Sequence, residues 1–177
     1  MSNIADLDIA NIGKPIIPPK EGWYHAKLVS QEPGSTQKGS INKQKWQIVG
    51  ATPELQNERG KYVYETLYEY SSVFFKQVAL IGWALGKYSP EYLKALQAKG
   101  ADLPMPDFEE WIGRSCLIKV KHRVDQNNPD KKYTEIGFDY ATFDSTVGQA
   151  TGVILDMSSI DAEQNVSASN DTADDFF

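Results

Sequence analysis

The chain has 177 residues, enough for one domain of ordinary size with tails. Hydrophobic residues make up 41% of it and aromatic residues 11%, which supplies a core and excludes a chain that is disordered throughout. A single cysteine, Cys116, excludes an internal disulfide, and with only two histidines it leaves no ligand set for structural zinc. No signal peptide or long apolar stretch is evident, so we expect a cytoplasmic protein without a membrane span.

The net charge of −6 is concentrated at the C-terminal end. Residues 151–177 hold six acids and no Lys or Arg, so residues 1–150 carry 18 basic and 18 acidic side chains. The part of the chain expected to fold is therefore neutral, and a nucleic-acid ligand is not excluded.

The first third of the chain predicts an arm and two strands. Residues 1–20 contain three prolines and no clear period, which indicates an N-terminal arm. A strand begins at Gly22, and alternation places Tyr24, Ala26 and Leu28 on one face and Trp23, His25 and Lys27 on the other. Turn-forming residues at 32–42 predict a long loop before a second strand, whose core residues are Trp46 and Ile48.

A third strand and three helical segments follow. Residues 61–70 form the strand, with its tyrosines on one face and Val63 and Leu67 on the other. Ser71 or Ser72 is expected to cap one helix, and Ser89 starts a second that stops at Gly100. A last helical turn ends at Gly113, and we assign Trp46, Trp83 and Trp111 to the core.

Two further strands complete the pattern. The fourth alternates Cys116, Ile118 and Val120 with basic residues, and the fifth groups Ile136, Phe138 and Tyr140. Five strands with helices between the third and fourth predict a five-stranded OB-type barrel spanning residues 21–147, with residues 148–177 as a flexible acidic tail. An SH3-like barrel or a helix-covered sheet would give a similar count of strands.

Single-strand binding needs cations along the phosphate path and flat rings on which bases stack. Basic residues expected to point away from the core are Lys27, Lys43, Lys45, Lys61, Lys119, Lys121 and Arg123. Any one of them alone is an ordinary solvated side chain, but residues 114–123 contain four bases and no acid, which indicates a positive stripe.

The tyrosines of the third strand are the predicted stacking residues. A small barrel cannot enclose all of these rings, so we expect Tyr62, Tyr64 and Tyr68 to face outward, with Trp23 as a further stacking candidate. Glu65 makes the opposite face a poor core face, and a bulge that switches faces is the alternative. The two histidines, His25 and His122, are expected at the surface or at strand edges.

The tail ends in two acids and two phenyl rings, a composition typical of a docking peptide. The partner-binding residues predicted from it are Asp171, Asp174, Asp175, Phe176 and Phe177. The sequence lacks the glycine-loop, HExxH and GxSxG patterns, so we expect no enzyme, no cofactor and no metal. A small metal-dependent nuclease and an OB-like module that binds only protein remain the alternatives.

The chain resembles phage-encoded single-stranded DNA-binding proteins with an OB fold. The resemblance rests on EGWYHAKLVSQEPG, ERGKYVYETL, GWALG and IGRSCLIKVKHRV, and on an acidic tip ending in phenylalanine. It implies coating and protection of single strands during phage or plasmid replication, recombination and repair in the host cytoplasm. It also implies recruitment of replication or recombination proteins through the tail, and it leaves open whether the chain forms a homo-oligomer.

Overall fold

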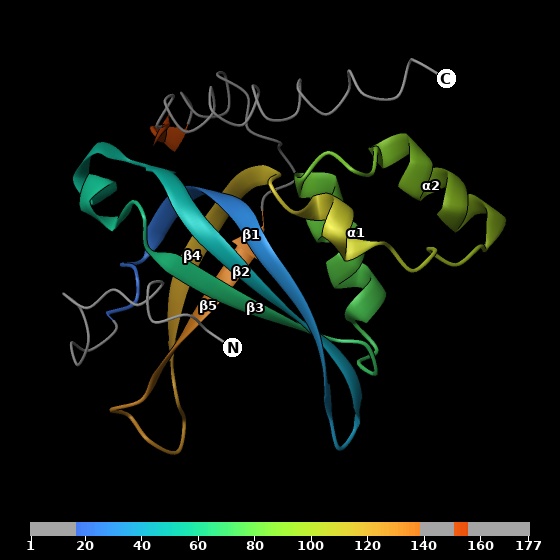
Figure 1. Ribbon diagram of the computed structural model, residues 1–177, viewed down its shortest axis with the longest axis horizontal. Helices are drawn as coiled ribbons and strands as arrows, with labels where there is room; N and C mark the ends of the chain where they lie inside the picture. The colour runs from blue at the N-terminus through green and yellow to red at the C-terminus, as the bar shows by residue number, and fades with distance from the viewer. Residues whose placement is uncertain (1–16, 139–150, 156–177) are drawn as a thin grey trace, which may run out of the picture.

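The structure, a computed structural model, describes residues 17–138 and 151–155. Its strands are β1 (Gly22–Thr36), β2 (Gly39–Ala51), β3 (Tyr62–Tyr68), β4 (Ser115–Val124), β5 (Lys132–Phe138) and β6 (Ile154–Leu155). Its α-helices are α1 (Phe74–Ala84) and α2 (Pro90–Lys99), and its 3-10 helices are η3 (Pro53–Glu58) and η4 (Phe108–Trp111). The chain is thus mainly β, and both α-helices follow β3 and precede β4 (Figure 1).

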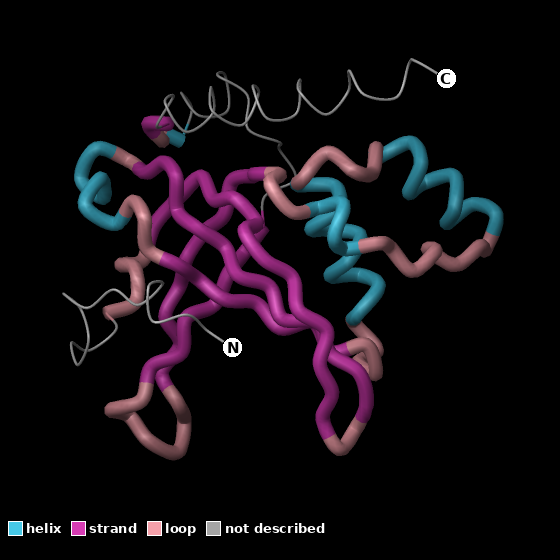
Figure 2. The backbone as a smooth tube through the Cα atoms, viewed as in Figure 1, coloured by secondary structure: helices cyan, strands magenta, loops and turns pink. Residues whose placement is uncertain are grey.

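The strands form one antiparallel sheet in the order β3-β2-β1-β4-β5, and β6 pairs with the end of β2. The sheet is open across the described ranges, because β3 and β5 approach each other without forming a ladder. Figure 2 shows how the long strands curve and cross one another. Helix α1 contacts both β3 and β5, so it packs beside the opening.

Strand alternation places one face of the sheet inward. The largest fully buried side chains include Trp46, Trp111, Tyr24 and Phe74, which confirms two of the three tryptophans expected in the core. Trp83 is only half-buried. Because alternation holds along β3, Val63 and Leu67 are buried, and no register shift interrupts its pairing with β2.

The predicted long loop at residues 32–42 is wrong. β1 and β2 continue as a hairpin until Thr36 pairs with Gly39, which leaves Gln37 and Lys38 as the turn. The Thr36 hydroxyl accepts a hydrogen bond from the Lys38 amide at 3.2 Å. Turn propensity at Pro33 and Gly34 yields to cross-strand pairing, since a hairpin satisfies most of the backbone groups that a loop would leave to water.

The helix ends follow local capping rules in one case and not in the other. In α2 the Ser89 hydroxyl accepts from the Tyr92 amide, and Gly100 ends the helix at φ 61°, as predicted. Helix α1 instead has Val73 at its N-cap position, one residue after Ser72 and two after Ser71, and begins at Phe74. The Ser71 hydroxyl accepts from the Val73 amide and so supports the preceding turn.

The five described residues beyond residue 150 belong to the folded part. Val153 is buried, and Ile154 and Leu155 pair with Ala51 and Gly50 of β2, although we expected the tail to begin at residue 148. Tyr140 and the tail tip lie outside the described residues. No helix in the described part of the chain is both long and apolar enough to cross a membrane.

Candidate nucleic-acid interface

The outer face of β3 carries a row of exposed aromatic rings. Tyr62, Tyr64 and Tyr68 are 42%, 63% and 43% exposed, whereas Val63 and Leu67 between them are buried. The outward orientation predicted for the three tyrosines is therefore confirmed, and their role in stacking stays a prediction. Tyr70 extends the row, with its ring centroid 5.7 Å from that of Tyr68.

Strand β2 places lysines beside these rings. The antiparallel register sets Lys45 opposite Tyr64 and Lys43 opposite Thr66, so all four side chains share the outer face. The Lys45 ammonium lies 4.1 Å from the centroid of the Tyr62 ring, within the range of a cation–π contact. We call Lys43, Lys45, Tyr62, Tyr64 and Tyr68 the tyrosine face.

A second group of cations and rings lies on β1, β4 and β5. The Lys119 ammonium is 5.3 Å from the Trp23 ring, and Arg123 is 5.6 Å from the Tyr133 ring. Arg123 also forms an exposed ion pair of 2.7 Å with Glu135, and a pair this open to water contributes little stability. Replacing the Glu135 carboxylate by a phosphate as the partner of Arg123 would therefore cost little free energy. We call Trp23, Lys119, Lys121, Arg123 and Tyr133 the β4 stripe.

Strand β1 carries Trp23 of the β4 stripe and separates the rest of the stripe, on β4 and β5, from the tyrosine face on β2 and β3. Lys27 on β1 is paired with Gln47 of β2 on one side and Ser115 of β4 on the other, so it lies between the two groups. The predicted basic and aromatic residues thus share the outer face of the sheet but occupy its two halves. A single nucleic-acid strand that contacted both groups would have to cross β1.

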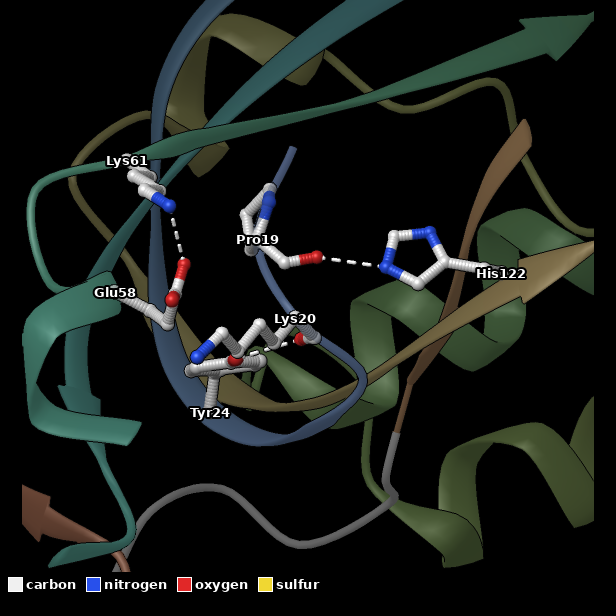
Figure 3. Close-up of polar contacts among 6 residues, drawn as sticks. All are labelled: Pro19, Lys20, Tyr24, Glu58, Lys61 and His122. Carbon is white, nitrogen blue, oxygen red and sulfur yellow. Dashed lines mark hydrogen bonds and ion pairs between the residues drawn. The ribbon is translucent and has the colours of Figure 1, made fainter. Parts of the chain in front are cut away.

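Lys61 is an exception among the predicted phosphate contacts. Its ammonium forms an ion pair of 2.6 Å with Glu58, whose side chain is almost fully buried (Figure 3). The Glu58 charge needs this partner because an unpaired buried carboxylate is costly. Lys61 is therefore held by Glu58 at the start of β3 and is not a free cation on the outer face.

Figure 3 also shows how the first described residues are held. The Tyr24 hydroxyl donates to the Lys20 carbonyl at 2.6 Å, and burial, followed by the Glu58 charge, raises the pKa of Tyr24 to about 12. The Pro19 carbonyl lies 2.8 Å from His122 Nε2. Pro19 and Lys20, at the described end of the predicted arm, are thus tied to the sheet.

His25 was expected at the surface, and that expectation is wrong. It alternates with the core residues of β1, yet it is only 2% exposed, between Gly50 of β2 and the equally buried Leu117 of β4. Burial lowers its pKa to about 4, so the ring is neutral at physiological pH. This part of the outer face is covered and does not offer a cation to a ligand.

Sequence reasoning missed Tyr133 and Lys131 as parts of the surface. Tyr133 is 37% exposed, and its ring has the Lys131 ammonium at 5.1 Å in addition to Arg123. Two lysines followed by an aromatic residue, at positions 131–133, were the signal that could have placed them on a basic and aromatic surface. Its pairing in β5 opposite Arg123 joins it to the β4 stripe.

The partner-binding residues of the tail, 171–177, lie outside the described residues. Within residues 17–138 and 151–155, no three His, Cys, Asp or Glu side chains are grouped to hold a metal ion. No protein-family model matches this chain, and no curated protein matches it.

Proposed function

We propose that this protein binds single-stranded DNA on the outer face of its sheet and protects it during replication, recombination and repair. The observation that carries the proposal is the contact between the Lys45 ammonium and the Tyr62 ring beside the exposed ring of Tyr64. A cation between open aromatic rings suits a backbone phosphate between stacked bases.

We also propose that the open sheet is an OB-type barrel. The support is the strand order, in which β1 lies between β2 and β4 and the two end strands β3 and β5 approach each other. Helix α1 contributes Val78 and Ile81 to the core beside that approach. OB folds commonly bind oligonucleotides across strands two and three, which are the strands of the tyrosine face.

For the tail we propose recruitment of replication or recombination proteins through Asp171, Asp174, Asp175, Phe176 and Phe177. The support is compositional: carboxylates suit a basic rim and phenyl rings suit a pocket. Deletion of residues 171–177 should abolish partner binding while DNA binding persists. Loss of DNA binding in the truncated protein would contradict this division of roles.

Point variants of the tyrosine face test the DNA site. Tyr64→Ala should cost about 1–3 kcal/mol of binding to oligo-dT, because one stacked base loses its platform. Lys45→Gln should lower both the affinity and its dependence on salt, by about 0.7 in the slope of log K against log salt for one phosphate contact.

The matched controls are Tyr92→Ala and Lys94→Gln on helix α2, which remove an exposed ring and an exposed lysine from outside the outer face. They should leave oligo-dT affinity unchanged. Equal effects of the two pairs of variants would overturn the assignment of the site. Cleavage of poly-dT in Mg²⁺ would favour a nuclease, and no binding to poly-dT at low salt would favour a module that binds only protein.

A further inference from the structure

A groove of about 270 Å³ lies on the opposite side of the β1–β2 hairpin from the tyrosine face. Gln31 and Pro33 of β1 alternate with outward Glu32. They form one wall together with Asn42 of β2 and with Glu69, the residue that follows β3. The residues just before and within η4 form the other wall, where Met105 is 54% exposed and Phe108 is buried. The groove is too small for an ordinary cofactor and suits one or two side chains.

The groove is acidic. Glu69, Asp107 and Glu109 line it, and no Lys or Arg among the described residues does. Asn42 donates a hydrogen bond of 2.7 Å to Glu69, which fixes that carboxylate in the wall. We call this site the acidic groove. An occupant with both positive charge and apolar surface would complement it, and DNA would be repelled.

Gln31, in the wall of the acidic groove, carries an amide that lacks a partner among the described residues. Both polar atoms of the Gln31 side chain are buried, and neither has a hydrogen-bond partner among the described residues. Unsatisfied buried polar groups are rare and call for an explanation. A peptide segment bound in the groove would explain the unpaired amide of Gln31. Its N–H groups would donate to the amide oxygen and its C=O groups would accept from the amide nitrogen, once the Gln31 side chain turns toward the groove.

The chain itself presents a suitable segment. Residues 125–131 connect β4 to β5 and contain the acids Asp125 and Asp130. The positive charge is local to Lys131 and Lys132, which are exposed beside the partly exposed Tyr133 ring and form the hairpin tip with the connecting residues. In Figure 1 this hairpin tip and the β1–β2 hairpin both project at the lower end of the view, well apart from each other. A copy therefore cannot place its own hairpin tip in its own acidic groove.

We propose that the hairpin tip of one copy docks in the acidic groove of the next copy, so that Lys131 and Lys132 meet its carboxylates. Such a contact is head-to-tail, because it joins two different surfaces of neighbouring copies. When each copy binds the next in this way, the copies form an open row. The groove is small, so the contact is weak between free copies. On one DNA strand it acts at a high effective concentration and produces cooperative coating, a consequence that rests on the proposed function.

Charge reversal on long DNA tests the cooperative consequence. Glu109→Lys should reduce the cooperativity of binding to poly-dT by about tenfold, because tethered copies lose their mutual contact. The same variant should bind the shortest oligo-dT that holds one copy at least as tightly as the unchanged protein, since an acid has been replaced by a base. Electrostatics without docking predicts tighter binding to both DNAs, and that result would overturn the proposal.

Two further variants sharpen this comparison. Combining Glu109→Lys with Lys132→Glu should restore cooperativity, because each reversed groove then meets a reversed hairpin tip. Glu91→Lys, on exposed helix α2, makes the same charge change outside the acidic groove and should leave cooperativity unchanged. A double variant no more cooperative than Glu109→Lys alone would contradict the pairing of these two surfaces.

A measurement without DNA separates this proposal from the DNA-binding function. A spin label on Gln126→Cys in unenriched protein, mixed with ¹⁵N-labelled protein, should broaden the amide signals of Gln31 and Glu109. The native Cys116 is buried and stays unlabelled. Glu109→Lys in the ¹⁵N-labelled copy should remove the broadening. Broadening confined to other surfaces, or none at millimolar protein, would overturn the docking whether or not the protein binds DNA.

Discussion

Glu65 offers a direct test of how the opening between β3 and β5 is built. Its side chain lines a cavity of about 80 Å³ together with apolar residues of β3, α1 and β5. Burial raises the pKa of Glu65 to about 7; a hydrogen bond from the Thr66 amide opposes this shift, and the Glu135 charge adds to it. The carboxyl group is therefore largely protonated in the folded protein at mildly acidic pH.

The shift gives the pH dependence a sign and a size. Between pH 4.5 and 7 the folded protein holds a proton on Glu65 that the unfolded chain releases, so the free energy of unfolding falls as pH rises through this window. At about 1.4 kcal/mol per pKa unit, the full loss is roughly 3 kcal/mol above pH 7. Solvent access at the opening makes this figure an upper value.

Glu65→Gln should therefore be more stable than the unchanged protein at pH 8, by up to roughly 3 kcal/mol, and about equal to it at pH 4.5. Urea unfolding followed by tryptophan fluorescence from pH 4.5 to 8 measures this difference. Glu91→Gln, which alters an exposed acid on α2 outside the cavity lining, serves as the control, and its stability difference from the unchanged protein should stay nearly constant with pH. If the stability difference between Glu65→Gln and the unchanged protein does not change with pH, the conclusion that Glu65 is buried and protonated is refuted.

Three shorter predictions follow from other contacts. His25 has its pKa lowered to about 4, so relative to His25→Gln the unchanged protein should lose up to roughly 3 kcal/mol of stability as pH falls from 6.5 to 4, measured by the same urea series. Gly50→Ala would place a Cβ 2.7 Å from the Ile154 carbonyl oxygen, so hydrogen exchange at Leu155 should accelerate while exchange in β4 stays slow. Lys61→Gln should lower the free energy of unfolding by about 1–3 kcal/mol because Glu58 loses its partner. The same variant should bind oligo-dT with an affinity within twofold of the unchanged protein. A large loss of affinity would show that Lys61 belongs to the DNA site.

The sequence predicted the parts of this fold that depend on local alternation and capping. The two faces of β3 follow from a period of two, and the bounds of α2 follow from Ser89 and Gly100. The outward tyrosines could be inferred because a small core cannot hold so many rings. These inferences needed no knowledge of which strands are neighbours.

The remainder depends on contacts between distant segments. The burial of His25 depends on tertiary contacts, and so does the ion pair of Lys61 with buried Glu58. Strand alternation predicts neither of them. The separation of the outward cations into two groups depends on β1 lying between β2 and β4. The length of the β1–β2 hairpin was missed because cross-strand pairing outweighs the turn preference of Pro33 and Gly34.

The most direct test of the central claim is a titration with oligo-dT at low and high salt, followed by tryptophan and tyrosine fluorescence. The account predicts saturable quenching, an affinity that falls steeply with salt, and weaker binding by Tyr64→Ala at both salt concentrations. Binding that ignores salt, or a Tyr64→Ala variant that binds and quenches like the unchanged protein, would contradict a DNA site on the tyrosine face.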